Sequence, residues 1–206
     1  VFIDYYRIED NVTLSVEGSM TDANPARVGE TYKAVTYNVG FGAYTPDYTF
    51  FMDGGKSSWA ESKESVVETI QGAAQTVQEL DPDLILLEEV DLDATRSYHV
   101  AQDALFSQSF ADYCYDLAID FDSPFLFYPF TQPHGKSLSA LMTYSRLPIT
   151  SALRRSLPIS ESLSKLVDLD RCYSVSRIPV VTELAPDAMY DVIFVVLRYT
   201  QLDSVL

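Results

Sequence analysis

Residues Leu84 to Asp91 read LILLEEVD, in which four large aliphatic residues are followed by three acids within four positions. A short unbroken run of branched apolar residues, entered through the turn pair Asp81-Pro82, predicts a strand buried on both faces. Because side chains alternate along a strand, we expect Glu89 and Asp91 on one face and Glu88 on the other. Two carboxylates then converge at the strand end, either as solvated acids leaving a core or as part of a site.

The composition is that of an acidic chain with a well-filled interior. It has 206 residues, the size of one ordinary domain, and 47% of them are hydrophobic. The formal net charge of −16 repels nucleic acid phosphates, so a small or neutral-headed substrate is favoured over nucleic acid. Cys114 and Cys172 lie outside any metal-binding cluster and are expected as free thiols, with one disulfide as the alternative. No apolar run reaches the roughly 18 residues of a membrane span.

The order of periodic segments predicts a single α/β domain over residues 31–206, preceded by an extended arm over 1–30 with one strand at Val12–Val16. A β-rich run ends at Asn38, an aromatic loop follows over 43–58, and residues 59–80 carry apolar positions at helical spacing. With LILLEEVD these segments make a βαβ-like unit, whose strand ends meet at one edge of the sheet. We therefore expect Asn38 and Glu89 to be neighbours. A helix over 98–119 and strands over 137–145, 171–181 and 190–197 are also expected.

A familiar order of motifs runs through the chain: YNVG at 37–40, a helix, DPDLILLEEVD at 81–91, and a serine-rich strand ending in SRLPI at 145–149. Over about residues 32–181 the chain resembles the endonuclease/exonuclease/phosphatase superfamily, the deoxyribonuclease-I-like metal-dependent phosphoesterases. The resemblance implies a four-layer α/β/β/α sandwich, in which two sheets pack face to face between helices. It also implies hydrolysis of a phosphate ester with the help of Mg²⁺ or Mn²⁺.

The resemblance places the metal at the end of LILLEEVD. Glu89 would be the metal carboxylate, because Mg²⁺ prefers hard oxygen ligands. The amide of Asn38 would coordinate the metal or orient the phosphate without adding charge. Asp91 would stand behind these groups and hold the next loop or Arg96 in place.

Substrate contacts are expected from DATRSYHV at 93–100, where Arg96 would grip phosphate bidentately with Tyr98 and His99 beside it. The alternative is an exposed helix start. Ser145 would face the site from its strand, although small hydroxyls on strands also pack or bond to the backbone. His134 lies in a loop without an orienting acid, and we expect it at the surface.

The second half of the family's catalytic set is absent from the sequence. No Asn-x-His is present, no Asp-x-Asn is followed by a downstream Ser-Asp-His, and Arg198 stands about where a histidine is expected. Either the chain is an N-terminal portion of a longer enzyme, which the ending TQLDSVL favours, or it is a degenerate member without the reaction. A partial sheet would expose its edge and favour self-association.

The expected function is metal-dependent hydrolysis of a phosphodiester or phosphomonoester, in a small molecule or a lipid headgroup, with an inactive fragment as the alternative. The resemblance to bacterial family members also implies an extracytoplasmic enzyme that is membrane-tethered at full length. Two rival functions are left open. One is an endonuclease, which a basic groove around Arg96, Lys136, Arg146 and Arg171 would favour. The other is a binding or structural module on the same fold.

Overall fold

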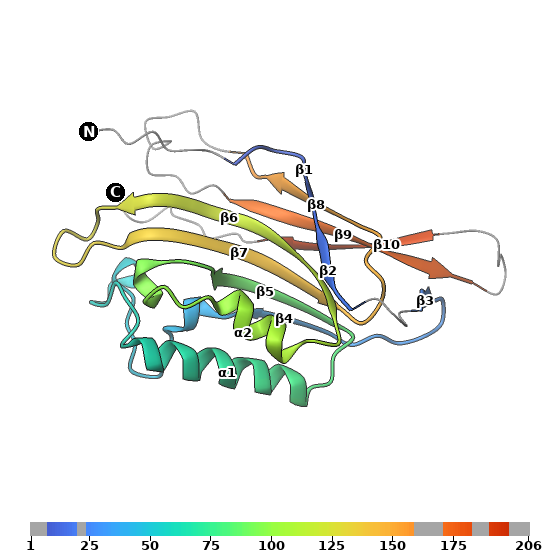
Figure 1. Ribbon diagram of the computed structural model, residues 1–206, viewed down its shortest axis with the longest axis horizontal. Helices are drawn as coiled ribbons and strands as arrows, with labels where there is room; N and C mark the ends of the chain where they lie inside the picture. The colour runs from blue at the N-terminus through green and yellow to red at the C-terminus, as the bar shows by residue number, and fades with distance from the viewer. Residues whose placement is uncertain (1–7, 20–23, 159–170, 183–189, 198–206) are drawn as a thin grey trace.

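Two β-sheets pack face to face in the computed structural model, which describes residues 8–19, 24–158, 171–182 and 190–197 (Figure 1). The first sheet has the order β1-β8-β9-β10, with β3 beside β9: β1 (Val12–Leu14), β8 (Ser151–Ser156), β9 (Cys172–Val181), β10 (Tyr190–Leu197) and β3 (Ala26–Arg27). The second has the order β2-β6-β7-β5-β4: β2 (Val16–Gly18), β6 (Cys114–Leu126), β7 (Gly135–Ser145), β5 (Leu84–Asp91) and β4 (Ala34–Asn38).

Two α-helices, α1 (Lys63–Glu79) and α2 (Gln102–Ser109), cover the outer face of the second sheet (Figure 1). Short 3₁₀ turns are η1 (Gly40–Gly42), η2 (Phe51–Asp53) and η3 (Thr95–Ser97). Within the described ranges no α-helix covers the outer face of the first sheet. The described residues therefore supply three layers, α/β/β, of the expected four-layer sandwich. None of the helices among them is long and apolar enough to cross a membrane.

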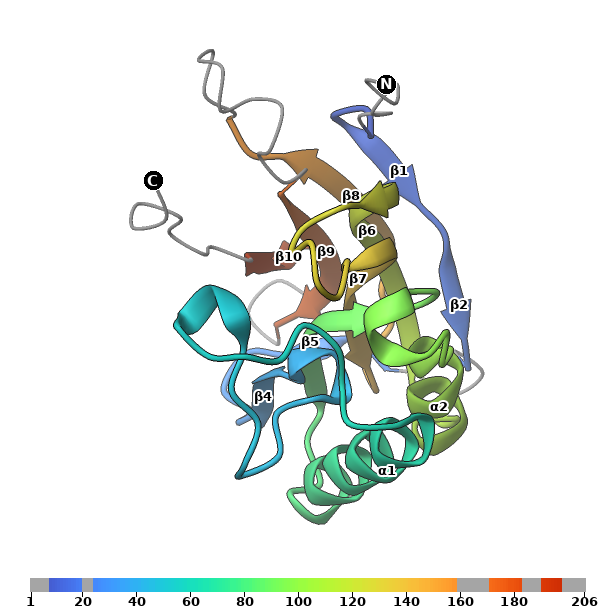
Figure 2. The same ribbon diagram turned by 90° about the vertical axis from the view of Figure 1, so that its left-hand side faces the viewer.

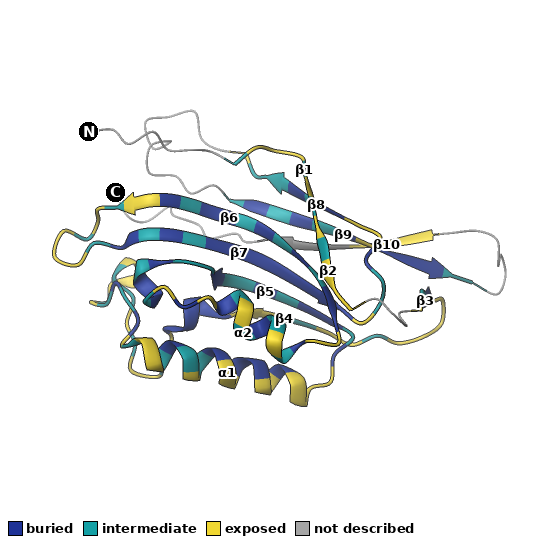
Figure 3. Ribbon diagram, in the orientation of Figure 1, coloured by how far each residue is buried: buried dark blue, intermediate teal, exposed yellow. Residues whose placement is uncertain are grey.

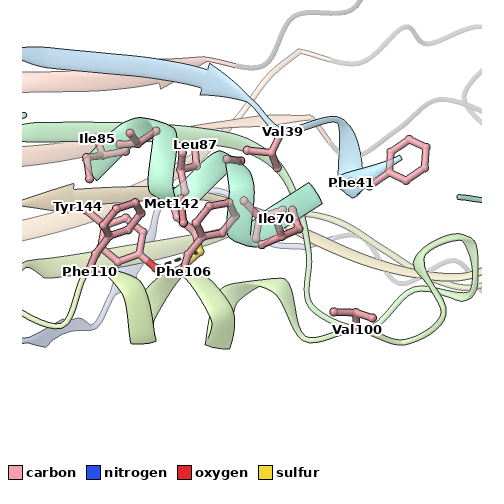
Figure 4. Close-up of a cluster of buried hydrophobic side chains, with 14 of the residues drawn as sticks. Val39, Phe41, Ile70, Ile85, Leu87, Val100, Phe106, Phe110, Met142 and Tyr144 are labelled. Atoms are coloured by element: carbon pink, nitrogen blue, oxygen red, sulfur yellow. Dashed lines mark hydrogen bonds between the residues drawn. The ribbon is translucent and has the colours of Figure 1, made fainter. Parts of the chain in front are cut away.

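The predicted βαβ unit is confirmed. β4 and β5 run parallel, in a register that pairs Ala34 with Leu84 and Asn38 with Glu88, and α1 makes the crossover. Between the helices and the second sheet lies the main core (Figure 4). It is built from large apolar side chains in and next to the two helices and in β5 and β7, among them Ile70, Val77, Ile85, Leu87, Phe106, Phe110, Met142 and Tyr144. Burial along α1 follows its inner face, while the outer face is exposed (Figure 3).

The start of α1 is fixed by a capping hydroxyl. Ser62 has extended backbone angles, and its side chain accepts a hydrogen bond of 3.0 Å from the backbone N–H of Ser65. Ser62→Ala should lower the free energy of unfolding by about 1 kcal/mol, because that N–H loses its partner. Urea unfolding of the variant beside Gln71→Ala, an exposed mid-helix change, would measure it. Equal stability of Ser62→Ala and the parent would contradict the capping role.

The predicted helix over 98–119 is wrong in its second half, because residues from Cys114 onward belong to β6. The spacing of apolar residues in this segment fits both the period of a helix and the period of a strand. As a strand, β6 alternates: Asp116 faces the first sheet and accepts a 2.6 Å hydrogen bond from Ser176, while Leu117 packs toward the helices. Backbone pairing of β6 with β2 on one side and β7 on the other outweighs the helical spacing.

The predicted strand at 12–16 is instead two short strands in different sheets. β1 pairs with β8 and β2 pairs with β6, so the chain passes from one sheet to the other at Ser15. The strands expected at 137–145, 171–181 and 190–197 are present as β7, β9 and β10. Both Cys114 and Cys172 are free and buried, as expected.

Candidate functional site

Asn38 and Glu89 meet at the carboxyl ends of β4 and β5, as the βαβ unit predicts. The Asn38 amide Nδ2 donates to Glu89 Oε1 at 3.1 Å, and the backbone N–H of Gly40 donates to Asn38 Oδ1 at 2.9 Å. A backbone N–H can only donate, so the amide oxygen must face Gly40 and the amide nitrogen must face Glu89. The side chain of Asn38 is thereby held at both ends.

Glu89 lies in a β-bulge. Between Leu87 and Val90, β5 has one more residue than the facing stretch of β7. Glu89 has φ +58°, the left-handed region that costs a non-glycine residue roughly 1 kcal/mol or more. In a regular strand, side chains alternate between the two faces, and this alternation is why Glu89 and Asp91 were expected on one face. The bulge interrupts it, since Val90 packs in the same core cluster as Leu87. The bulge turns the Glu89 side chain away from the position that a regular strand would give it.

Asp91 is fully buried and bound to Arg96. Its carboxylate accepts hydrogen bonds from Arg96 Nε (3.0 Å), Arg96 Nη2 (2.8 Å) and the hydroxyl of Ser97 (2.8 Å). The guanidinium also lies over the ring of Phe41, 3.9 Å from its centroid. The expected contact between Asp91 and Arg96 is thus present. This contact corrects the expectation that Arg96 grips phosphate bidentately, because the two donors that would do so, Nε and Nη2, already bond to the buried carboxylate of Asp91.

His134 is buried, which corrects the expectation of a surface residue. Arg96 Nη1 lies 3.4 Å from His134 Nε2, and Ser58 Oγ lies 3.0 Å from Nδ1. Arginine can only donate, so Nε2 accepts and the proton sits on Nδ1, which donates to Ser58. Burial, and then the charge of Arg96, lowers the pKa of His134 to about 3. The imidazole is therefore neutral at physiological pH.

Tyr98 and His99, the other predicted contacts of this segment, have protein partners. The hydroxyl of Tyr98 donates to the carbonyl of Glu61 at 3.1 Å, and its ring packs edge-on against Trp59. His99 Nδ1 is 2.5 Å from Asp93 Oδ1, and the same carboxylate pairs with the ammonium of Lys136. These residues tie the loop after β5 to the segment that precedes α1 and to β7, and their expected role toward substrate stays a prediction.

Ser145 lies at the wrong end of the sheet for a substrate contact. It pairs with Leu84 at the start of β5, five residues before Glu89, which is on the order of 15 Å along a strand. Its hydroxyl donates to the carbonyl of Leu147 at 2.7 Å and accepts from the Leu147 N–H at 3.0 Å. The serine closes a turn, the alternative that the sequence left open.

An aromatic loop borders the candidate site. Tyr44 donates to Asp53 Oδ2 at 3.4 Å. Burial raises the pKa of Tyr44 to about 12, with further contributions from the negative charges of Asp53 and Glu89. The positive charge of Arg96 acts in the opposite direction but is the smallest of these contributions.

The chemistry of this edge fits a hard divalent cation held mainly by one residue. Glu89 offers a carboxylate, and Mg²⁺ commonly takes one or two protein carboxylates and completes its shell with water and phosphate oxygens. Asn38 turns its nitrogen toward Glu89, so it is better placed to position the carboxylate than to coordinate a metal itself. Among the described residues there is no cluster of three or more His, Cys, Asp or Glu side chains that could hold a metal.

Known proteins resemble this chain in sequence pattern and in fold. The model of the endonuclease/exonuclease/phosphatase family matches residues 35–203. An endonuclease/exonuclease/phosphatase from Beutenbergia cavernae DSM 12333 is similar in structure, with a TM-score of 0.51 and 17% identity over 80% of this chain and 37% of that one. A family protein from Leptotrichia buccalis C-1013-b gives a TM-score of 0.47 and 14% identity over 84% of this chain and 57% of that one.

The chain thus spans 37% and 57% of the lengths of these two solved chains. No curated protein matches it. The first structural likeness supports the deoxyribonuclease-I-like sandwich, and the family match covers most of the sequence. The chain belongs to the endonuclease/exonuclease/phosphatase family.

Proposed function

We propose that this chain forms part of a divalent-metal-dependent phosphoester hydrolase, in which Glu89 binds Mg²⁺ or Mn²⁺ and Asn38 positions its carboxylate. One observation carries the proposal. Glu89 adopts a costly left-handed conformation at a bulge, and the fixed amide of Asn38 bonds to its side chain. Membership of a family that generally hydrolyses phosphoester bonds agrees with this proposal.

The residues of the chain would prepare the site before substrate arrives. Asn38 holds one oxygen of Glu89, and the buried pair of Asp91 and Arg96 anchors the loop that follows β5. A bound divalent cation would supply neutralisation of the phosphoryl oxygens. The carboxylates near Tyr44 would help to recruit that cation.

The preferred substrate is a small phosphoester or a lipid headgroup. The rival endonuclease needs a basic groove, but three of the four basic residues considered for it are paired with acids: Arg96 with Asp91, Lys136 with Asp93 and Arg146 with Asp81. Such pairing, together with the net charge of −16, disfavours a phosphate backbone as the ligand. The extracytoplasmic location and the membrane tether remain proposals.

Self-association through a sheet edge is also kept as a proposal. Among the described strands, β4 pairs only with β5 and ends the second sheet, while β10 pairs only with β9 and ends the first. Exposed apolar side chains lie on these edges, among them Tyr37, Tyr190, Val192 and Ile193. These edges are where a second copy or the remainder of a longer chain would pair.

The test is Mn²⁺ binding by the parent, Glu89→Gln and Glu68→Gln, an exposed change on α1. Glu89→Gln should bind Mn²⁺ about tenfold more weakly or worse, since a charged ligand is lost, while Glu68→Gln should match the parent. Hydrolysis of an aryl phosphodiester, with an EDTA control, is measured in parallel. Equal Mn²⁺ affinity in all three proteins would refute the proposed metal site.

Turnover separates two forms of the proposal. Metal-dependent hydrolysis that is lost in Glu89→Gln would mean that this chain alone completes a site. Metal binding through Glu89 without hydrolysis would mean that the acid and base groups come from elsewhere in a longer protein.

A further inference from the structure

The tip of the β6–β7 hairpin, residues 124–134, exposes an unusual concentration of aromatic side chains, and we call it the aromatic tip. It extends beyond the body of the two sheets at the left of Figure 1, and much of its surface is exposed in Figure 3. Four rings are from 50% to 78% exposed: Phe125, Phe127, Tyr128 and Phe130. Phe130 lies against both Phe127 (5.9 Å between centroids) and Tyr128 (5.8 Å), so these three rings form one patch.

The aromatic tip also lacks negative charge, in a protein that is rich in it. The chain contains 30 acids, yet none lies between Asp122 and Glu161. The one base next to the tip, Lys136, is paired with Asp93. The tip therefore offers rings, hydroxyls and amides to solvent, without charged groups that would oppose transfer into an apolar environment.

The aromatic tip lies at the same end of the molecule as the candidate metal site. Figure 2 looks onto this end, where the tip, the aromatic loop and the carboxyl ends of β4 and β5 are seen together. The ring of Phe51 in the aromatic loop is 5.6 Å from that of Tyr128 in the tip. In the same loop the ring of Phe51 lies 4.8 Å from that of Phe50, which lies 6.3 Å from that of Tyr44. The ring of Tyr44 packs against Gly40, whose N–H donates to Asn38. One continuous aromatic surface thus joins the tip to the site.

We propose that the aromatic tip docks this protein onto a zwitterionic lipid surface. Aromatic side chains that combine an apolar body with a few polar atoms favour the membrane interface, and phenylalanine adds buried apolar area. A zwitterionic surface, such as phosphatidylcholine, fits because the chain as a whole carries a charge of −16 and is repelled by anionic lipids.

Docking would bring lipid headgroups to the end of the sheet that holds Asn38 and Glu89. The suggestion that such headgroups are the substrate rests on the proposed function. The docking itself does not, because it depends on the tip and not on Glu89. The two ideas can therefore fail separately.

The experiment is flotation with phosphatidylcholine vesicles, without added metal. The parent should float with the vesicles, and Phe127→Ser/Phe130→Ser should partition at least about tenfold more weakly, because two interfacial rings are lost. The matched control is Val28→Ser/Tyr190→Ser, which removes two exposed apolar side chains around β3 and the start of β10. It should partition like the parent. Phe130→Ser alone, at the most exposed ring, serves if the double variant does not fold.

Further arms distinguish other partners and the proposed function. Replacing about one third of the lipid by phosphatidylglycerol should weaken binding, because the protein is acidic. Absence of parent binding, or equal loss in the tip and control variants, would overturn the proposal.

A parent dimer that sedimentation shows to dissociate in the tip variant, without vesicle binding, would assign the patch to a second copy instead. Glu89→Gln should float like the parent even where it loses Mn²⁺; flotation that required Glu89 would overturn docking through the tip.

Discussion

Asp91→Asn is expected to lower the free energy of unfolding by about 3–5 kcal/mol, because it leaves the buried guanidinium of Arg96 without its counter-charge. Both side chains lie in the interior, and two of the donors of Arg96 point at the carboxylate of Asp91. Asparagine keeps the size of the side chain and one acceptor oxygen. It cannot compensate the charge of Arg96, so the free energy of unfolding falls by the cost of burying an unpaired cation.

The measurement is urea unfolding of Asp91→Asn beside Asp191→Asn, which breaks an exposed ion pair with Arg177. The exposed pair should matter little, since solvent screens it. A third protein, Asp91→Asn/Arg96→Met, removes both charges and should be more stable than Asp91→Asn alone. If Asp91→Asn lost no more stability than Asp191→Asn, the buried pair would not anchor this loop.

The sequence predicts best those features that depend on regular periodicity. Helix α1 and the parallel strands around it follow from helical spacing and a short apolar run, and their geometry brings Asn38 to Glu89. The first residues of β6, up to Ile119, fall in the predicted helix because their apolar spacing fits both a helix and a strand. Only the pairing of β6 with its neighbouring strands decides between the two. The bulge at Glu89 contains no glycine, so the sequence gives no signal for it.

Contacts between distant segments could not be predicted in this way. The sequence predicts a phosphate contact for Arg96 because it does not show that Asp91 is buried. In the structure the buried carboxylate of Asp91 accepts two hydrogen bonds from Arg96. The sequence predicts His134 at the surface because it is a single histidine in a loop that shows no orienting acid. Its partner Ser58 lies 76 residues away, and the rings of Phe50 and Phe51 cover it from the same loop.

The burial of His134 predicts a loss of stability in acid. Its pKa is about 3 in the folded protein, against about 6.5 for an unperturbed histidine. Below about pH 6.5 the unfolded chain binds a proton that the folded chain excludes, so this contribution to stability is present above that pH and is lost as the pH falls toward 3. Between about pH 7 and pH 4 the loss is on the order of 3 kcal/mol.

Asp116 acts in the opposite direction over part of this range. Burial raises its pKa to about 6, so its folded form takes up a proton before its unfolded form does. Its contribution is present below about pH 3.8 and is lost as the pH rises through about 6. The net pH dependence of the parent therefore understates the effect of His134.

The difference between two proteins isolates each group. His134→Asn keeps groups that can bond to Ser58 and Arg96 but does not titrate in this range. Urea unfolding at about pH 7, 5.5 and 4.5 should show a shallower decline for His134→Asn than for the parent, since its unfolded state gains no extra proton. Asp116→Asn should show a steeper decline than the parent. Parallel curves for the parent and His134→Asn would mean that the imidazole accepts a proton in the folded protein, and that its partners rearrange to accommodate the charge.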